Sequence, residues 1–356
     1  MSRQEPTPFL SKGMPGDLHD MRRINRNRIL RSIITRGPAT RAELSRRTGM
    51  SRPTVSVIAN ELLTSGVLME GDRVSSGGAP GTLLEIAKDT GVTLVVDLRE
   101  VEHVIMATVS PGGEIVKRVV TSVRNEADLV SQVGAFASTV ERSSLIGAAI
   151  AVHGFIDPAG TWQYDATRAL DVSVIDQLRK KLRMDVWPVN ATDAMTLADL
   201  RDSDEGLAAQ ATVVVRGIAI GLVIDGSMLT GTKRPAGDVA HLVVAHDGPM
   251  CDECGKTCLF ATVAQLYTGG DTQLAREQSA AGIAAVMAPV CAVAEVEEIV
   301  LALLPDACAE EVCKRTQANL RALLPFEQAP VVRLSTMGED AVLVGAALMY
   351  LHKRLI

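Results

Sequence analysis

Aromatic residues are scarce in this chain of 356 residues, at 3% of the sequence, although 47% of it is hydrophobic. Its cores must therefore be built mainly from Ala, Val, Leu and Ile. No apolar run reaches the roughly 20 residues that a membrane-spanning helix needs. Residues 1–20 lack the apolar segment of a signal peptide and are expected to form a disordered leader. These absences favour a cytoplasmic protein, and the length predicts two or three domains.

The chain has only six cysteines, which would favour disulfides only in a secreted protein. Three of them, Cys251, Cys254 and Cys258, lie within eight residues, and His241 lies ten residues upstream. Three thiolates and one imidazole complete a tetrahedral zinc site and leave no position for a water molecule. We therefore predict one structural Zn²⁺ ion per chain. The alternative is a loop with unligated thiols.

Positive charge is concentrated at the N-terminal end. Residues 1–88 hold 14 Lys and Arg against 8 Asp and Glu, a net charge of +6, whereas the remainder has a net charge of −12. A basic segment on an acidic body is typical of a local surface that binds phosphate groups.

Three consecutive helices are predicted in this basic segment. The first covers residues 22–35, with an apolar stripe on one face and arginines on the other. Thr40 and Glu43 have the spacing of a capping box, which starts the second helix. A tight turn with a glycine at residues 48–50 leads to the third helix, which Ser51 caps.

Two strands are expected to follow, at residues 67–70 and 82–86. The first would end in a turn at residues 71–72, and residues 75–78 would form a flexible tip. The pattern predicts a winged helix-turn-helix over residues 21–88, which binds double-stranded DNA. The alternative is a small helical bundle whose arginines form a solvated face.

The third helix leaves polar side chains outside its apolar stripe, as reading of base edges in a major groove requires. Arg52, Thr54 and Ser56 are the candidates for base contacts, and Arg26 and Arg28 belong to the candidates for phosphate contacts. The predicted DNA-binding residues are Arg41, Arg46, Arg47, Ser51, Arg52, Thr54, Ser56 and Arg73.

Beyond residue 88, short buried strands alternate with helices, which predicts an α/β body with mixed sheets. Helices are expected at residues 126–141, 174–182 and 194–200, a mostly helical stretch at 262–325, and a final apolar helix at 335–355.

The ordered segments of the whole chain resemble the ROK family, which groups repressors and sugar kinases. The resemblance implies an actin-like, or ribonuclease-H-like, body. Its first α/β lobe would cover residues 89–195, completed by the C-terminal helix at 336–356, and its second lobe, with the zinc loop, residues 196–335. It also implies a dimer or tetramer whose DNA affinity responds to a sugar or sugar phosphate. The resembling segments are 97–104, 151–160, 189–200, 216–231, 236–244 and 251–258.

Three departures from the family pattern argue against phosphoryl transfer. Residues 97–101 stand where the family has D-x-G-G-T, so the glycines are lost and Glu100 would repel phosphate. Ala191 stands where the family has its catalytic Asp, and Asp193 is a poor substitute. The second phosphate loop, at residues 217–221, lacks a hydroxyl. We therefore predict that the protein is not an enzyme. The alternative is a bifunctional regulator that phosphorylates a hexose with ATP.

Departures also affect the ligand sites. The family pattern C-x-C-G-x-x-G-C is C-x-x-C-G-x-x-C here, and His246 is the alternative metal ligand if the loop does not absorb the shift. Phe260 replaces a sugar-binding Glu of the family, which favours a less polar effector. The remaining candidate effector-binding residues are His153, Gly154, Asn190, Asp238 and His241.

These observations predict a transcription regulator, a repressor by its resemblance, which binds an operator as a homodimer or tetramer. A sugar-like or other small molecule would control it through a shift between two conformations. A further alternative is a body that has lost its ligand and only pairs two DNA-binding heads.

Overall fold

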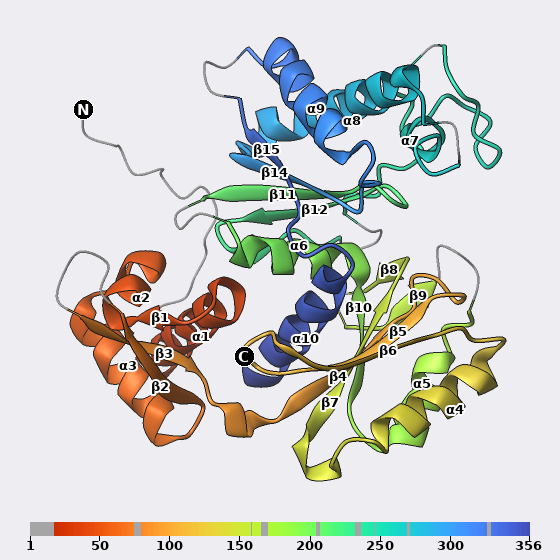
Figure 1. Cartoon of the computed structure of the whole chain (residues 1–356). Helices are drawn as coiled ribbons and strands as arrows, with labels where there is room; N and C mark the ends of the chain where they lie inside the picture. The colour runs from red at the N-terminus through yellow and green to blue at the C-terminus, as the bar shows by residue number, and fades with distance from the viewer. Residues whose placement is uncertain are drawn as a thin grey trace, which may run out of the picture.

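The computed structural model describes residues 18–74, 80–157, 159–164, 170–203, 207–231, 236–245, 247–268, 271–325 and 329–356. Within them, a small head packs beside two α/β lobes (Figure 1). The head lies at the lower left of the view, the first lobe at the lower right and the second lobe at the top. Two helices, α6 (Ala191–Arg201) and α10 (Asp340–Leu355), run between the lobes. The predicted α/β class with a helical head is confirmed.

The head contains α1 (Leu18–Arg36), α2 (Arg41–Thr48) and α3 (Arg52–Thr64). Because α1 begins at Leu18, the end of the expected disordered leader is helical; residues 1–17 lie outside the described part of the chain.

The start of α2 has the predicted capping box. The Thr40 hydroxyl oxygen accepts a hydrogen bond from the Glu43 N–H at 3.2 Å, and the Glu43 carboxylate accepts one from the Thr40 N–H at 2.7 Å. Gly49 ends this helix with a φ of 68°, a left-handed conformation that costs little without a Cβ atom. The capping box fixes where α2 begins, and Gly49 opens the tight turn that leads to α3.

The wing differs from the expected hairpin. The strand β2 (Leu68–Val74) continues through Gly71 and Asp72, which were predicted to form a turn. Its pairing with β3 (Gly81–Ile86) shifts between Glu70 and Arg73, so these residues belong to a β-bulge. A short strand, β1 (Ala39–Thr40), pairs with the other side of β3. The expected flexible tip at residues 75–78 lies outside the described residues.

The first lobe has a five-stranded sheet in the order β10-β7-β4-β5-β6. β4 pairs in parallel with β7 and antiparallel with β5, so the sheet is mixed. Two helices, α4 and α5, pack on one face; α4 ends at Ala137, earlier than the predicted residue 141. The elements are β4 (Val92–Asp97), β5 (Val104–Val109), β6 (Ile115–Thr121), α4 (Glu126–Ala137), β7 (Leu145–Val152), β8 (Phe155–Ile156), β9 (Trp162–Tyr164), α5 (Val174–Leu182) and β10 (Val186–Asn190), with short 3₁₀ turns at Lys88–Thr90 and Arg142–Ser144.

The second lobe has a five-stranded sheet in the order β13-β12-β11-β14-β15, covered by α8 and α9. Two of its strands, β14 and β15, were missed because they lie in and beside a stretch that was expected to be mostly helical. The elements are β11 (Ala209–Val214), β12 (Ala219–Ile224), β13 (Ser227–Met228), α7 (Leu259–Ala264), α8 (Gln273–Ala294), β14 (Glu298–Ala302), α9 (Ala309–Leu323) and β15 (Val331–Leu334).

By length and hydropathy alone, α8 is apolar enough to cross a membrane. Here it forms part of the second-lobe core, where Ile283 and Met287 are fully buried. Its first turn carries Arg276, which forms ion pairs with Asp271 (2.6 Å) and Glu311 (2.8 Å). These contacts identify α8 as a core helix of this fold.

The contact between α6 and α10 joins the two lobes. A Cβ atom on Gly345 of α10 would lie 1.7 Å from the carbonyl oxygen of Ala194 in α6. A Cβ atom on Gly221 of β12 would lie 1.8 Å from the Thr196 hydroxyl on the other side of α6. Only glycine allows such close approach, so both lobes pack tightly on α6.

The head packs against the body through a shared hydrophobic core and is not connected to it by the chain alone. The buried residues of α1 belong to the same continuous core as those of α6 and α10. Three arginines of α1 also donate hydrogen bonds to the body: Arg26 to the Leu355 carbonyl (3.4 Å), Arg31 to the Ser227 hydroxyl (3.2 Å) and Arg36 to the Leu207 carbonyl (3.2 Å). Arg26, predicted to contact phosphate, is therefore engaged at the head–body contact.

Candidate functional site

The outer face of α3 presents its side chains for contact with a partner. Arg52 and Asn60 are exposed, and Ser56 is half-buried. The Ser51 hydroxyl caps the helix by accepting from the Thr54 N–H at 3.3 Å, and it lies 2.8 Å from the Thr54 hydroxyl. These two hydroxyls are thus partly used within the helix start.

Val57 is a surface residue of α3 that the sequence analysis missed. It is 54% exposed, whereas its neighbours Val55 and Ile58 are buried. The signal was present, since Val57 falls outside the apolar stripe of this helix. An apolar side chain there suits contact with a thymine methyl group.

The arginines of α2 and of the wing differ in whether their guanidinium groups already have hydrogen-bond partners. Arg46 and Arg73 are exposed and, within the described residues, make no hydrogen bond or ion pair. Arg47 donates to the Gly37 carbonyl at 3.4 Å, and Arg41 donates to the Asn60 side chain at 3.1 Å. Of the predicted phosphate contacts in α2, Arg46 is therefore the one with its guanidinium available.

The four predicted metal ligands come together in the second lobe. The ligand atoms of His241, Cys251, Cys254 and Cys258 all lie within 4.8 Å of one another. His241 Nδ1 lies 3.8 Å from Cys251 Sγ and 3.7 Å from Cys258 Sγ. Tetrahedral zinc with ordinary bond lengths would separate such atoms by about 3.6 Å, so the donor set fits this ion. The loop absorbs the shifted cysteine; His246 lies outside the described residues.

The surroundings of the cluster orient His241 for metal binding. Its Nε2 lies 3.3 Å from the Glu253 carboxylate, which leaves Nδ1 for the metal, an arrangement typical of bound histidines. The N–H groups of Cys254 and Glu253 hydrogen-bond to the Cys251 sulfur and lower the pKa of its thiol to about 7. A low thiol pKa favours the thiolate form that binds metals. The cluster can therefore hold a metal ion.

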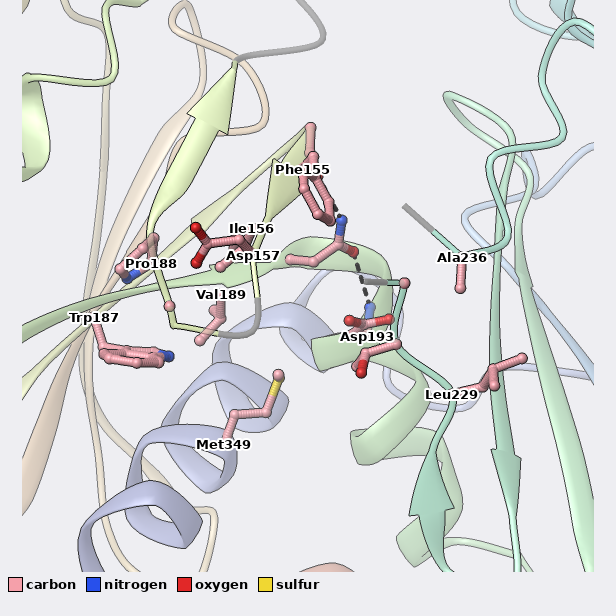
Figure 2. Close-up of a pocket in the computed structure, with 15 residues that line it drawn as sticks. Phe155, Ile156, Asp157, Trp187, Pro188, Val189, Asp193, Leu229, Ala236 and Met349 are labelled. Carbon is pink, nitrogen blue, oxygen red and sulfur yellow. Dashed lines mark hydrogen bonds between the residues drawn. The ribbon is translucent and has the colours of Figure 1, made fainter. Parts of the chain in front are cut away.

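A cavity of about 220 Å³ lies between the lobes (Figure 2). Gly154, Asp157 and Trp187 line it from the first lobe, and Leu229 and Ala236 line it from the second. Asn190 and Asp193 at the start of α6 and Met349 of α10 complete its wall. The cavity thus spans the junction where the two lobes meet.

Asp193 is the acidic group of α6 in this cavity. Burial of its carboxyl raises the pKa of Asp193 to about 7. At neutral pH the group is balanced between a donor and an acceptor of hydrogen bonds, which suits contact with a ligand hydroxyl. From its place in the sequence, Asp193 is only a poor substitute for the family's catalytic Asp, and the structure adds its position in the cavity.

The predicted effector residues are not all at this cavity. Gly154 and Asn190 line it, but the Asn190 side chain is already engaged in hydrogen bonds within the protein. Its oxygen caps α6 by accepting from the N–H groups of Thr192 (2.8 Å) and Asp193 (3.1 Å), and its NH₂ group donates to the Gly154 carbonyl at 3.1 Å (Figure 2).

The other three predicted effector residues lie elsewhere. Asp238 is exposed and does not line the cavity, and His241 belongs to the cysteine cluster. His153 faces the β11–β12 turn, since its Cε1 atom would lie 3.9 Å from a Cβ atom on Gly217. Sequence spacing could not place these residues, because the cavity is lined by loops from both lobes.

The two loops expected to bind phosphate in a kinase are joined by ion pairs. Arg99 forms a two-pronged pair with the buried Asp97, with contacts of 3.0 and 2.7 Å. Arg216, in the β11–β12 turn, lies 3.4 Å from Glu100 in the β4–β5 turn and 3.8 Å from Glu339 before α10. The Arg216–Glu100 ion pair thus bridges the two turns.

Comparison with known proteins agrees with this arrangement. The profile of the ROK family matches residues 102–265, and a profile for winged helix-turn-helix DNA-binding domains matches residues 22–69. The chain is 24% identical to the xylose repressor of Bacillus subtilis (strain 168) over 258 residues, which are 66% of this chain and 64% of that protein. The match therefore spans slightly less than two thirds of the relative's length.

Solved structures show the same fold. A ROK family transcriptional regulator, a homologue of the E. coli MLC protein, superposes with a TM-score of 0.64 at 18% identity, covering 94% of this chain and 96% of that one. A ROK family protein from Streptococcus pneumoniae TIGR4, in complex with sucrose, superposes with a TM-score of 0.61 at 16% identity, covering 74% of this chain and 99% of that one.

Asp193 makes a testable contribution to stability. Its pKa is raised by folding, so the folded chain loses stability as the pH rises from about 4 to about 7. Asp193→Asn should therefore nearly match the wild type at pH 4 and exceed it by about 2 to 4 kcal/mol at pH 8. Denaturant unfolding at both pH values measures this difference. Asp176→Asn, in an exposed ion pair of α5, is the control; a pH-independent gain for Asp193→Asn would contradict the prediction.

Proposed function

We propose, from the premise that this chain is a ROK family protein with an N-terminal winged helix-turn-helix domain, that it is a DNA-binding transcription regulator. The observation that carries the proposal is the outer face of α3, where Arg52, Val57 and Asn60 are exposed, together with the exposed Arg46 of α2. The relative named a xylose repressor supports repression as the mode of action.

The proposed operator complex contains two heads from a homodimer or tetramer. Each α3 would enter a major groove, and half-sites would lie about 34–36 Å apart or a multiple of that distance. Arg52, Thr54 and Ser56 would contact bases with Val57, while Arg46 and Arg73 would contact phosphates together with Arg28. Arg41 and Arg47 support the head surface through their contacts within it.

Arg46→Ala and Arg52→Ala should separate phosphate contacts from base contacts. Arg46→Ala should weaken all DNA sequences alike and lower the slope of log affinity against log salt by about one. Arg52→Ala should cost about 1–3 kcal/mol and relax specificity at one operator position. Binding to operators selected from a random library, at several salt concentrations, measures both effects.

Arg321→Ala is the matched control, since Arg321 is exposed on α9 in the second lobe, away from α2 and α3. Equal losses for Arg46→Ala and Arg52→Ala on every sequence would contradict this division of roles. Absence of any selected operator would overturn the proposed function itself.

We further propose that the body binds a small effector and transfers no phosphate. The pairing of Arg216 with Glu100 and Glu339 supports the loss of phosphoryl transfer, because it places carboxylates between the former phosphate loops. The interlobe cavity with Asp193, and the name xylose repressor carried by a relative, support a sugar-like effector. An apolar metabolite is the alternative that Phe260 favours.

A thermal-shift series with xylose, other pentoses and hexoses tests the effector. A sugar at a hundred times its dissociation constant should add about 2.7 kcal/mol to stability. Asp193→Ala should reduce this gain, and the same sugar with ATP should yield no ADP above the protein-free rate. Turnover of ATP would contradict the loss of kinase activity. The absence of a melting-temperature shift with every sugar tested would contradict a sugar effector.

We also propose that the cysteine cluster holds one structural zinc ion per chain. The support is the closed donor set of His241, Cys251, Cys254 and Cys258, and the burial of Cys251 and Cys258. Zinc bound there would fix the loop that connects β13 to α7, without an open position for chemistry.

Zinc removal should destabilise the chain. An ion at a thousand times its dissociation constant adds about 4.1 kcal/mol, so a chelator should lower the melting temperature by several degrees. Cys254→Ser should lower the bound zinc well below one per chain, whereas Cys291→Ala, in the core of α8, should retain it. Metal analysis of the purified proteins measures this. Equal zinc in both variants, or none in the wild type, would contradict the proposal.

A further inference from the structure

A second cavity, of about 270 Å³, lies where the head meets the body. Its walls come from α1 of the head and from α6, α10 and the β12–β13 hairpin of the body. The hairpin closes through Asp225 and Gly226, whose φ values of 49° and 69° match a two-residue turn of the primed type. We refer to this space as the seam cavity.

The seam cavity is largely apolar. Leu197 and Leu200 of α6, Val223 of β12, Met228 of β13 and Met349 of α10 line it. An engineered apolar cavity of about 150 Å³ holds a benzene ring, so the seam cavity has room for about ten heavy atoms. Its lining contains no acidic residue.

One cation faces this apolar space. Arg31 of α1 lines the cavity and donates one hydrogen bond, to the Ser227 hydroxyl at 3.2 Å. Within the described residues, Arg31 forms no ion pair, although a guanidinium offers five N–H donors. Burial and the nearby Arg31 lower the pKa of His352, which also lines the cavity, so this imidazole stays neutral at pH 7. Among the described residues that line the cavity, the charge is therefore positive, with no acidic side chain beside it.

We propose that the seam cavity is a binding site for a small monocarboxylate with an apolar chain or ring. The carboxylate would accept a two-pronged pair of hydrogen bonds from Arg31, and the apolar part would lie against Leu197, Leu200 and Val223. This ligand class satisfies both features of the site, since the guanidinium pairs with a carboxylate and the apolar walls exclude a polyol.

The seam cavity adjoins both the DNA-binding head and the interlobe cavity. Arg31 and Thr35 belong to the head, so an occupant contacts head and body together. Met349 also lines the interlobe cavity, where its side chain points up from α10 (Figure 2). Met349 is therefore a wall residue of both cavities. Control of DNA binding from the seam cavity rests on the proposed function above.

Calorimetric titration of the full zinc-loaded chain with octanoate tests the site. Octanoate has ten heavy atoms and should bind at one per chain. Arg31→Gln should weaken octanoate binding about ten- to a hundredfold, the range expected for loss of a charge-assisted hydrogen bond. Arg31→Lys should recover part of the affinity, and octanol should bind the wild type no better than octanoate binds Arg31→Gln.

Arg321→Gln, on the exposed surface of α9, is the matched control and should bind octanoate like the wild type. Val223→Phe should block binding by filling the cavity, with folding checked by its melting curve. Equal octanoate affinity for the wild type and Arg31→Gln, or no binding to the folded wild type, would overturn the proposal.

The regulatory consequence has its own readout. Octanoate should change operator affinity severalfold in the wild type but not in Arg31→Gln. If octanoate bound without any change in operator affinity, the proposed coupling to DNA binding would be overturned, whereas the proposed binding site would stand. A chain that binds octanoate but no DNA would overturn the proposed function alone, so the two failures are distinguishable.

Discussion

The close contact between α6 and α10 is the constraint on which the arrangement of this molecule depends. Gly345 lies directly against the Ala194 carbonyl, and Gly221 lies against Thr196 on the opposite side of the same helix. The first-lobe sheet packs on α10, the second-lobe sheet packs on α6, and α1 of the head contacts both helices. A small change in the angle between α6 and α10 must therefore move the lobes and the head together, because cores this dense do not deform locally.

The head belongs to the same packed unit, and this divides the arginines of α1 into two groups. Arg26, Arg31 and Arg36 donate hydrogen bonds to the body, whereas Arg28 is exposed. Positive charge in the N-terminal segment thus has two uses, one at the head–body contact and one at the surface. Composition alone cannot separate these two uses, since arginine serves in both.

Local signals in the sequence were sufficient for the three helices of the head and for the cysteine cluster. Thr40 with Glu43 sets a helix start by contacts within four residues, and the cysteine spacing brings three thiols together in one loop. Features that depend on distant partners were missed or misread. Gly71 and Asp72 have the composition of a turn, but pairing with β3 keeps them in a strand. The strand β14 is set by its parallel neighbour β11, far away in sequence.

The ion pairs of Arg216, in the β11–β12 turn, with Glu100 and Glu339 form a solvated link between the lobes. Arg216, Glu100 and Glu339 are each about half exposed, at 50%, 45% and 41%. Mobile ions screen such charges within about 8–10 Å, so dissolved salt loosens this link while it leaves the apolar contact of α6 with α10 intact. Among the described contacts between the lobes, the pairs made by Arg216 are consequently the ones that rising ionic strength weakens.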